Sequence, residues 1–279
     1  MIFPRLLALL GVFSALCAID TFHDKFILIG SDAQMPLQVV PYPQSPSLDN
    51  ILVKVVLPEN GEVQKKSPVS VQLKMVNFSL GVTTKNTLFP GLRENPKGQT
   101  IRVIIDNNPY LSVGVLSEDS YNADLDMMRK NLSFKLPDLE KGEHVIRVFP
   151  VTSFGESIKR QNNFDISTFY IGAKKNTINQ DLSKPFITYN EPQGEFRLKS
   201  PQEPVLLDFF LSNCTLTREG YKVRLTVDGS VLGNLYQWSP YLLFGLSKGK
   251  HTIKLELLDS RDAVVPGDFN STERTITIK

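Results

Sequence analysis

One strand-and-turn pattern occurs twice in this chain. Residues 139–147, with the sequence LEKGEHVIR, recur near the C-terminus as LSKGKHTIK at 246–254. A supersecondary pattern that recurs at domain distance predicts two copies of one fold. His144 and His251 then occupy equivalent corners, so we expect them to serve the fold and not catalysis. Further segments repeat with the pattern, namely 69–77 with 205–213 and 101–106 with 223–228.

Both copies have the pattern of β-strands. Short runs rich in β-branched residues alternate apolar and polar side chains, and turns with Pro, Gly and Asn separate them. Many such runs without a helical repeat predict a sandwich of the immunoglobulin (Ig) or fibronectin type. We therefore predict an all-β chain with two tandem Ig-like β-sandwich domains. The predicted strands are 51–57, 69–77, 101–106, 132–136, 143–151 and 164–171 in the first copy, and 185–191, 204–213, 221–228, 231–238, 240–245, 250–258 and 272–278 in the second.

Composition divides the chain further. Prolines and serines concentrate before the first copy, and a polar, aperiodic stretch separates the two copies, as is typical of spacers and linkers. The predicted segments are a signal peptide at 1–18, a Pro/Ser-rich spacer at 19–49, a first Ig-like domain at 50–172, a linker at 173–184 and a second Ig-like domain at 185–279.

The N-terminal segment has the pattern of an export signal. Arg5 precedes an uncharged, mostly apolar run at 6–19, which is too short to span a bilayer and suits a signal-peptide core. Ala15 and Cys17 are small residues of the kind that signal peptidase accepts. Cys17 could instead carry the lipid of a bacterial lipoprotein, although Leu16 departs from the Gly, Ala or Ser expected before it. Both alternatives predict an exported protein, in the periplasm or at the cell surface, whose membrane contact is at most a lipid anchor.

Charge and cysteine content exclude several functions. The net charge is +2, and the Lys and Arg residues are interleaved with acids, so we expect no nucleic-acid partner. Once Cys17 is removed or lipidated, Cys214 has no partner for an intrachain disulfide. Its position at the end of an apolar strand predicts a small buried side chain.

Catalytic motifs are absent from the sequence. It contains no Gly-x-Ser-x-Gly, His-Glu-x-x-His, Cys-x-x-Cys, phosphate-binding loop or Gly-x-Gly-x-x-Gly, and its three histidines are scattered. We therefore expect a protein that is not an enzyme and holds no cofactor and no metal. Acidic clusters leave Ca²⁺ binding as an alternative to solvated loops. These clusters are Glu118, Asp119, Asp124 and Asp126 in the first copy and Asp259, Asp262 and Asp268 in the second.

Two sets of residues that the copies do not share are candidates for binding. Tyr236 and Trp238 lie on one face of a predicted strand and could stack on a sugar or anchor a protein, whereas burial of Trp238 in the core is the alternative. The loop 150–163 could form a mixed polar and aromatic tip that attracts a phosphate or carboxylate group, with an ordinary solvated loop as the alternative. Its candidate residues are Phe154, Glu156, Lys159 and Arg160.

Longer phrases carry a family resemblance. GQTIRVIIDNNPY at 98–110 and GEHVIRVFPVTSFGESIK at 142–159 resemble a family of poorly characterised bacterial envelope proteins, as do VLLDFFL at 205–211 and GYKVR at 220–224. The resemblance covers roughly 50–279. It implies tandem Ig-like domains and an envelope location, and many members look like lipoproteins. Some members are automatically labelled phosphopeptide-binding, but the resemblance implies no established ligand.

These patterns together favour a binding protein. We expect a non-enzymatic, exported binding or scaffold module of the bacterial cell envelope, with a protein or glycan partner. The alternative is a module that recognises a carbohydrate or a phosphate group, and a hidden exported hydrolase is a further alternative. A catalyst would bring titratable groups with shifted pKa values together in one pocket.

Overall fold

The computed structural model describes residues 35–45, 50–85, 92–114 and 129–279. Regular structure in these ranges consists of β-strands and one short 3₁₀ turn, η2 (Gln161–Asn163). Among the same residues, no helix is long and apolar enough to cross a membrane. The described chain is therefore all-β, as predicted.

The first sandwich consists of two sheets around one apolar core. Its strands are β2 (Leu52–Leu57), β3 (Glu62–Gln64), β4 (Ser70–Val76), β5 (Thr100–Ile105), β6 (Leu111–Val113), β7 (Arg129–Lys135), β8 (Gly142–Val151) and β9 (Asp165–Ile171). One sheet has the order β2-β4-β7 and the other β3-β9-β8-β5-β6, with β3 parallel to β9. In β4, Val71, Leu73 and Met75 are buried in the core while Lys74 is exposed, because alternate side chains point to opposite faces.

The second sandwich repeats this strand order. Its strands are β10 (Phe186–Glu191), β11 (Gly194–Phe196), β12 (Val205–Ser212), β13 (Lys222–Val227), β14 (Ser230–Leu235), β15 (Tyr241–Phe244), β16 (Gly249–Leu258) and β17 (Ser271–Ile278). β10-β12-β15 corresponds to β2-β4-β7, and β11-β17-β16-β13-β14 corresponds to β3-β9-β8-β5-β6. Two packed sheets with this division of strands define Ig-like sandwiches.

The repeated histidines occupy the same corner of the two sandwiches. Nδ1 of His144 lies 2.9 Å from Oδ2 of Asp106, and its Nε2 lies 2.9 Å from a backbone carbonyl oxygen. His251 repeats both contacts, at 2.7 Å to Oδ2 of Asp228 and 2.8 Å to a carbonyl oxygen. The other oxygen of each aspartate accepts a hydrogen bond from the backbone N–H that follows the histidine. The predicted equivalence of the corners is confirmed.

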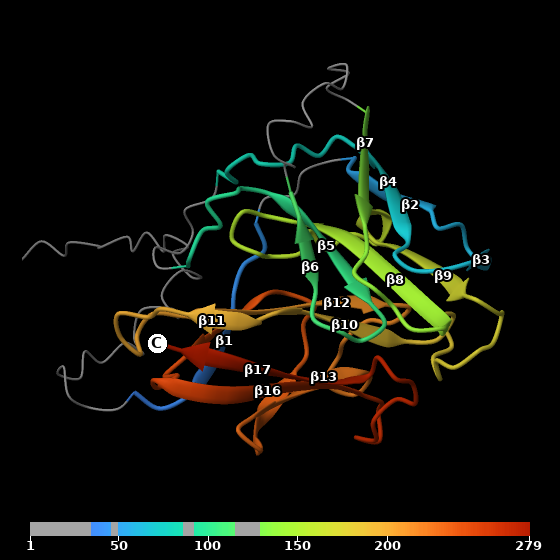
Figure 1. Cartoon of the computed structure of the whole chain (residues 1–279). Helices are drawn as coiled ribbons and strands as arrows, with labels where there is room; N and C mark the ends of the chain where they lie inside the picture. Colours follow the sequence, from blue (N-terminus) through green and yellow to red (C-terminus); the bar gives the residue numbers. More distant parts are fainter. Residues whose placement is uncertain (1–34, 46–49, 86–91, 115–128) are drawn as a thin grey trace, which may run out of the picture. The chain divides into compact units, whose positions relative to one another are not determined.

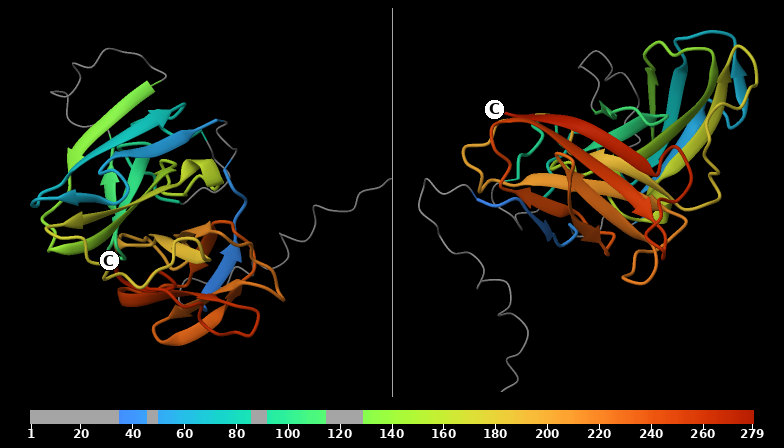
Figure 2. Two further views of the ribbon diagram at one scale, coloured as in Figure 1. Left: turned by 90° about the vertical axis from the view of Figure 1, so that its right-hand side faces the viewer. Right: turned by 90° about the horizontal axis from the view of Figure 1, so that it is seen from below.

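Residues 35–45, which we call the N-terminal strap, belong to the second sandwich. Within the strap, β1 (Gln38–Pro41) pairs antiparallel with β15 and adds a strand to the β10-β12-β15 sheet. Leu37 and Val39 pack against the core of that sandwich. Figure 2 shows the blue β1 among the orange strands in its left view.

The strap corrects the expectation of a spacer for the described part of 19–49. The flanking prolines concealed the strand in the sequence. Pro41 is tolerated because β1 lies at the edge of its sheet, where a missing N–H costs no ladder hydrogen bond.

The two sandwiches pack face to face. Outward side chains of β5 and β8 meet those of β10 and β12 in apolar clusters, one joining Phe149 to Phe210 and another joining Val145 to Phe269. Every residue of β5, β10 and β12 is buried, as in sheets that are covered on both faces. Figure 1 shows β5 and β8 lying between the β2-β4-β7 sheet and the pair β10 and β12.

Candidate ligand-binding cavity

The loop that follows β8 is a tight turn against the second sandwich. The N–H of Thr152 donates to the carbonyl of Glu156 at 2.9 Å, and the N–H of Gly155 donates to the carbonyl of Thr152 at 3.0 Å. Gly155 has a φ of 88°, and a Cβ at this position would lie 3.0 Å from Oε1 of Glu191. Glycine is therefore the residue that fits both the backbone conformation and the close approach.

Two of the predicted loop residues face inward. The Glu156 side chain accepts hydrogen bonds from the N–H and the hydroxyl of Ser45 in the strap, and Glu156 is 5% exposed. The Lys159 side chain is fully buried and forms an ion pair with Asp208 on β12. A solvated tip is thus the wrong description for Glu156 and Lys159. Charged groups are buried here because the strap and the second sandwich supply their partners. Arg160 is exposed.

Burial changes the acidity of Glu156. Its pKa is raised because burial disfavours the carboxylate, an effect that Lys159 and the hydrogen bonds from Ser45 oppose and that the nearby Asp208 reinforces. The Glu156 carboxyl group therefore accepts hydrogen bonds from the strap, and its burial and the nearby charges of Lys159 and Asp208 determine its pKa.

A set of buried polar residues, which we call the junction network, joins the two sandwiches. Arg102 of β5 forms an ion pair with Glu191 of β10, at 2.7 Å between Nη2 and Oε1. The hydroxyl of Tyr110 donates to the same Glu191 oxygen at 2.7 Å. The amide of Asn190 donates to Oδ2 of Asp208 at 2.7 Å. Burial raises the pKa of Glu191 against the opposing effect of Arg102.

The sequence did carry a signal for this network. Asp208 interrupts the apolar run of 205–211, and Arg102 interrupts the apolar run of 101–105. A charge inside a strand that is otherwise apolar indicates either a solvated face or a buried partner. The sequence does not distinguish the two, because the partner lies in the other sandwich.

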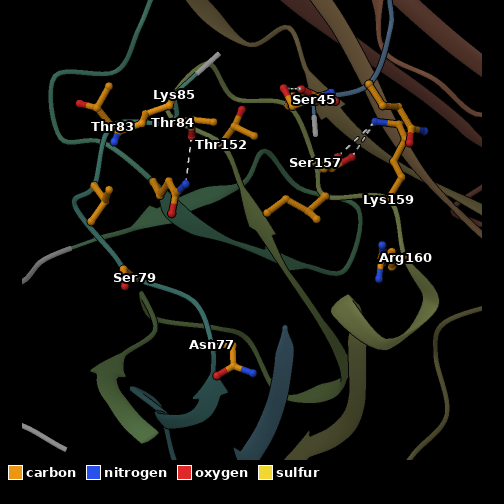
Figure 3. Close-up of a pocket in the computed structure, with 15 residues that line it drawn as sticks. Ser45, Asn77, Ser79, Thr83, Thr84, Lys85, Thr152, Ser157, Lys159 and Arg160 are labelled. Carbon is orange, nitrogen blue, oxygen red and sulfur yellow. Dashed lines mark hydrogen bonds between the residues drawn. The ribbon is translucent and has the colours of Figure 1, made fainter. Parts of the chain in front are cut away.

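A cavity of about 430 Å³ lies beside the loop. Three segments form most of its walls, namely the end of the strap, residues 77–85 after β4 and the loop 152–160, and Gln99 before β5 completes the lining. Figure 3 shows Thr83, Thr84 and Lys85 on one side and Arg160 on the other. The lining residues are Gln44, Ser45, Asn77, Ser79, Val82, Thr83, Thr84, Lys85, Gln99, Thr152, Glu156, Ser157, Ile158, Lys159 and Arg160.

Nine of the fifteen lining residues carry a hydroxyl or an amide group. Oγ1 of Thr84 accepts hydrogen bonds from Nε2 of Gln99 and from the N–H of Ser153, each at 3.0 Å. Oγ1 of Thr152 is buried and has no hydrogen-bond partner among the described residues. The cavity can therefore exchange hydrogen bonds with a small polar ligand.

The other predicted binding residues lie elsewhere. Nε1 of Trp238 donates to the carbonyl of Phe209 at 3.2 Å, and its ring packs edge-on against Phe210 with centroids 4.9 Å apart. Trp238 thus lies at the junction of the sandwiches, in agreement with the core alternative. The ring of Tyr236 lies 4.9 Å from the Arg218 guanidinium carbon. Because β14 ends at Leu235, Tyr236 and Trp238 do not share the strand face that the sequence predicted.

Phe154 lines a second, more open groove of about 720 Å³, with Arg102 and Glu191 among its other lining residues. The groove lies where the loop 152–160 meets the segment after β10. Phe154 is half-buried, so part of its ring remains accessible. Binding through Phe154, Tyr236 or Trp238 stays a prediction.

The acidic residues considered for Ca²⁺ have other partners. Oδ1 of Asp259 accepts two backbone N–H groups, Asp262 pairs with Lys222 at 2.7 Å, and Asp268 accepts the N–H of Asn179. The cluster at 118–126 lies outside the described residues. Cys214 is a half-buried thiol packed against the second core, and burial raises its pKa to about 12.

Comparisons with known proteins give only distant similarity. No family model matches the sequence, and no curated protein matches it. Among solved structures, the fibronectin(III)-like modules of CbhA from Clostridium thermocellum are 14% identical over 82% of this chain and 94% of that one, with a TM-score of 0.27. A CARDB domain from Pyrococcus furiosus is 12% identical over 46% of this chain and 97% of that one, with a TM-score of 0.24. Because these scores are low, the fold assignment rests on the strand order and register of the chain itself.

Proposed function

We propose that this chain is an exported, non-enzymatic binding module of a bacterial cell envelope, and that its ligand site is the cavity of Figure 3. The observation that carries the proposal is the cavity itself, whose size suits a small ligand and nine of whose fifteen lining residues carry a hydroxyl or an amide group. Hydrogen bonds join the wall segments, because Thr84 and Ser153 each donate a backbone N–H to the other's hydroxyl and Ser45 donates to Glu156. These contacts hold the walls together before a ligand enters.

The arrangement of the charged groups supports binding over catalysis. Among the hydroxyls that line the cavity, Oγ of Ser157 lies 3.0 Å from Nζ of Lys159. Ser157 is buried, however, and Nζ of Lys159 donates to Oγ of Ser157 and pairs with Asp208, so it is not placed to accept the serine proton. Both carboxylate oxygens of Glu156 accept hydrogen bonds from Ser45.

Export and anchoring are part of the proposal. They rest on the apolar run at 6–19 and on Cys17, which precede the strap in the chain. If Cys17 is lipidated, the protein from its native cells partitions into detergent, and Cys17→Ser moves it to the aqueous phase. An unchanged aqueous distribution of both proteins would instead indicate plain cleavage of the signal peptide.

A crosslinked pull-down from envelope fractions tests the site. Thr83→Trp places a large ring at an exposed position of the cavity wall, and Thr275→Trp makes the same exchange at an exposed position of β17. We expect the wild type and Thr275→Trp to retain one partner and Thr83→Trp to lose it. Equal recovery by all three proteins, or no recovery by the wild type, would contradict the proposed site.

A further inference from the structure

We infer that the ligand of this cavity is a small hydroxylated molecule that carries an oxyanion, such as an acidic sugar or a sugar phosphate; the inference rests on the proposed function.

Two wall hydroxyls have a proton to donate. A hydroxyl offers one O–H donor and two acceptor sites. Both acceptor sites of Thr84 are filled, by Gln99 and by the N–H of Ser153, so its O–H is the group that remains. Thr152 is 4% exposed, and its hydroxyl has no partner among the described residues. Buried polar groups are rarely left unpaired, and an acceptor oxygen of a ligand would satisfy both threonines.

The rim of the cavity is cationic. Lys85 and Arg160 are exposed on opposite sides of it, as Figure 3 shows. The exposed Lys85 ammonium can attract an oxyanion at the rim and form a charge-assisted hydrogen bond with it.

The rest of the lining explains why the ligand should also carry hydroxyl groups. Asn77, Ser79 and Thr83 are exposed in the cavity and can both donate and accept. Val82 and Ile158 are the apolar side chains of the lining, and no aromatic ring is among the described residues that form it. Much of the remaining wall surface is carbon, which the C–H faces of a compact polyol acid can contact while its hydroxyl groups exchange hydrogen bonds on several sides.

Thr152→Val gives a test in which stability and binding move differently. The exchange removes a hydroxyl that has no protein partner, so we expect the denaturation midpoint to stay constant or to rise. The same exchange at Thr272 is the matched control, because Thr272 is buried outside the cavity and its hydroxyl donates to Oδ1 of Asn107 at 3.0 Å. We expect Thr272→Val to lower the midpoint and leave binding unchanged.

Calorimetric titration with glucuronate, glucose 6-phosphate, inorganic phosphate and glucose identifies the ligand chemistry. We expect the wild type to bind glucuronate or glucose 6-phosphate more tightly than glucose, and Thr152→Val to weaken that binding by at least about tenfold. Lys85→Gln should weaken binding of the acids and leave glucose unaffected. The two acids separate a carboxylate from a phosphate source, and inorganic phosphate shows whether the anion alone suffices.

The outcomes separate the inference from the proposed function. If glucose binds as well as the acids and Thr83→Trp abolishes its binding, the cavity is a ligand site but the oxyanion is wrong. If neither acid binds at about 10 mM, or if Thr152→Val binds like the wild type, the inference is overturned. By contrast, a pull-down in which the wild type recovers no partner, or in which all three proteins recover it equally, contradicts the proposed function itself.

Discussion

The β2-β4-β7 sheet and the β10-β12-β15 sheet have the same strand order but different surroundings. In β4, the outward Lys74 is exposed, whereas the equivalent Phe210 of β12 is fully buried against the first sandwich. Gln72 of β4 is half-buried, whereas the equivalent Asp208 of β12 is fully buried and pairs with Lys159 of the loop. The comparison shows that one strand pattern can form an outer surface or an interior layer, depending on what packs on its second face.

The largest expected effect comes from exchanging these equivalent positions. Phe210→Ala removes a ring that contacts Phe149, Phe164 and Trp238, so we expect a loss of about 3–5 kcal/mol in the free energy of unfolding. Lys74→Ala at the matched position should stay within about 0.5 kcal/mol. Urea unfolding followed by tryptophan fluorescence measures both. If Phe210→Ala lost no more stability than Lys74→Ala, the stability of the chain would not depend on the packing of the Phe210 ring between the sandwiches.

The strap provides the second difference between the sandwiches. Gly245 has a φ of 83°, and a Cβ there would lie 2.6 Å from the carbonyl oxygen of Pro36. The equivalent residue in the first copy is Asp138, which is exposed, and among the described strands none pairs with the outer edge of β7. We expect Gly245→Ala to cost about 1–3 kcal/mol and to displace the strap, because both the backbone conformation and the contact oppose a side chain.

Hydrogen exchange of the β1 amides measures this displacement directly. Gly245→Ala should accelerate exchange at Gln38 and Val40, whose N–H groups face β15 in this register, while Asp138→Ala should leave it unchanged and alter stability by less than about 0.5 kcal/mol. Normal protection of β1 in Gly245→Ala would mean that the strap is held by other contacts.

The sequence predicted the fold because its main signals are local. Alternating strands and the repeated histidine phrase lie within single segments, and both sandwiches follow from them. The strap and the junction network depend on partners far away in the chain, such as Ser45 for Glu156 and Asp208 for Lys159. The loss of alternation in 205–211 did indicate a strand buried on both faces, but it did not indicate which surface covers it.

The smallest expected effect concerns the two corners that the sandwiches share. Both nitrogens of His144 and of His251 face acceptors, a carboxylate and a carbonyl, so each ring satisfies both only when it is protonated. The hydrogen bond to Asp106 raises the pKa of His144, with burial opposing it. Burial lowers the pKa of His251, but the bond to Asp228 outweighs it and the pKa is raised.

A raised pKa in the folded state fixes the direction of the pH dependence. The stabilisation by each histidine is complete below the unfolded pKa of about 6.5 and is lost as the pH rises through the folded pKa. We expect each corner to contribute up to about 1 kcal/mol, because both lie near the surface. The free energy of unfolding, measured by urea at pH 5.5 and 8.5, should fall with pH in the wild type. The fall should be smaller in His144→Gln or His251→Gln and smallest in the double variant, which retains the contribution of Glu156 and Glu191, whose pKa values are also raised. If one single variant removed the whole dependence, the two corners would differ in their titration despite their common geometry.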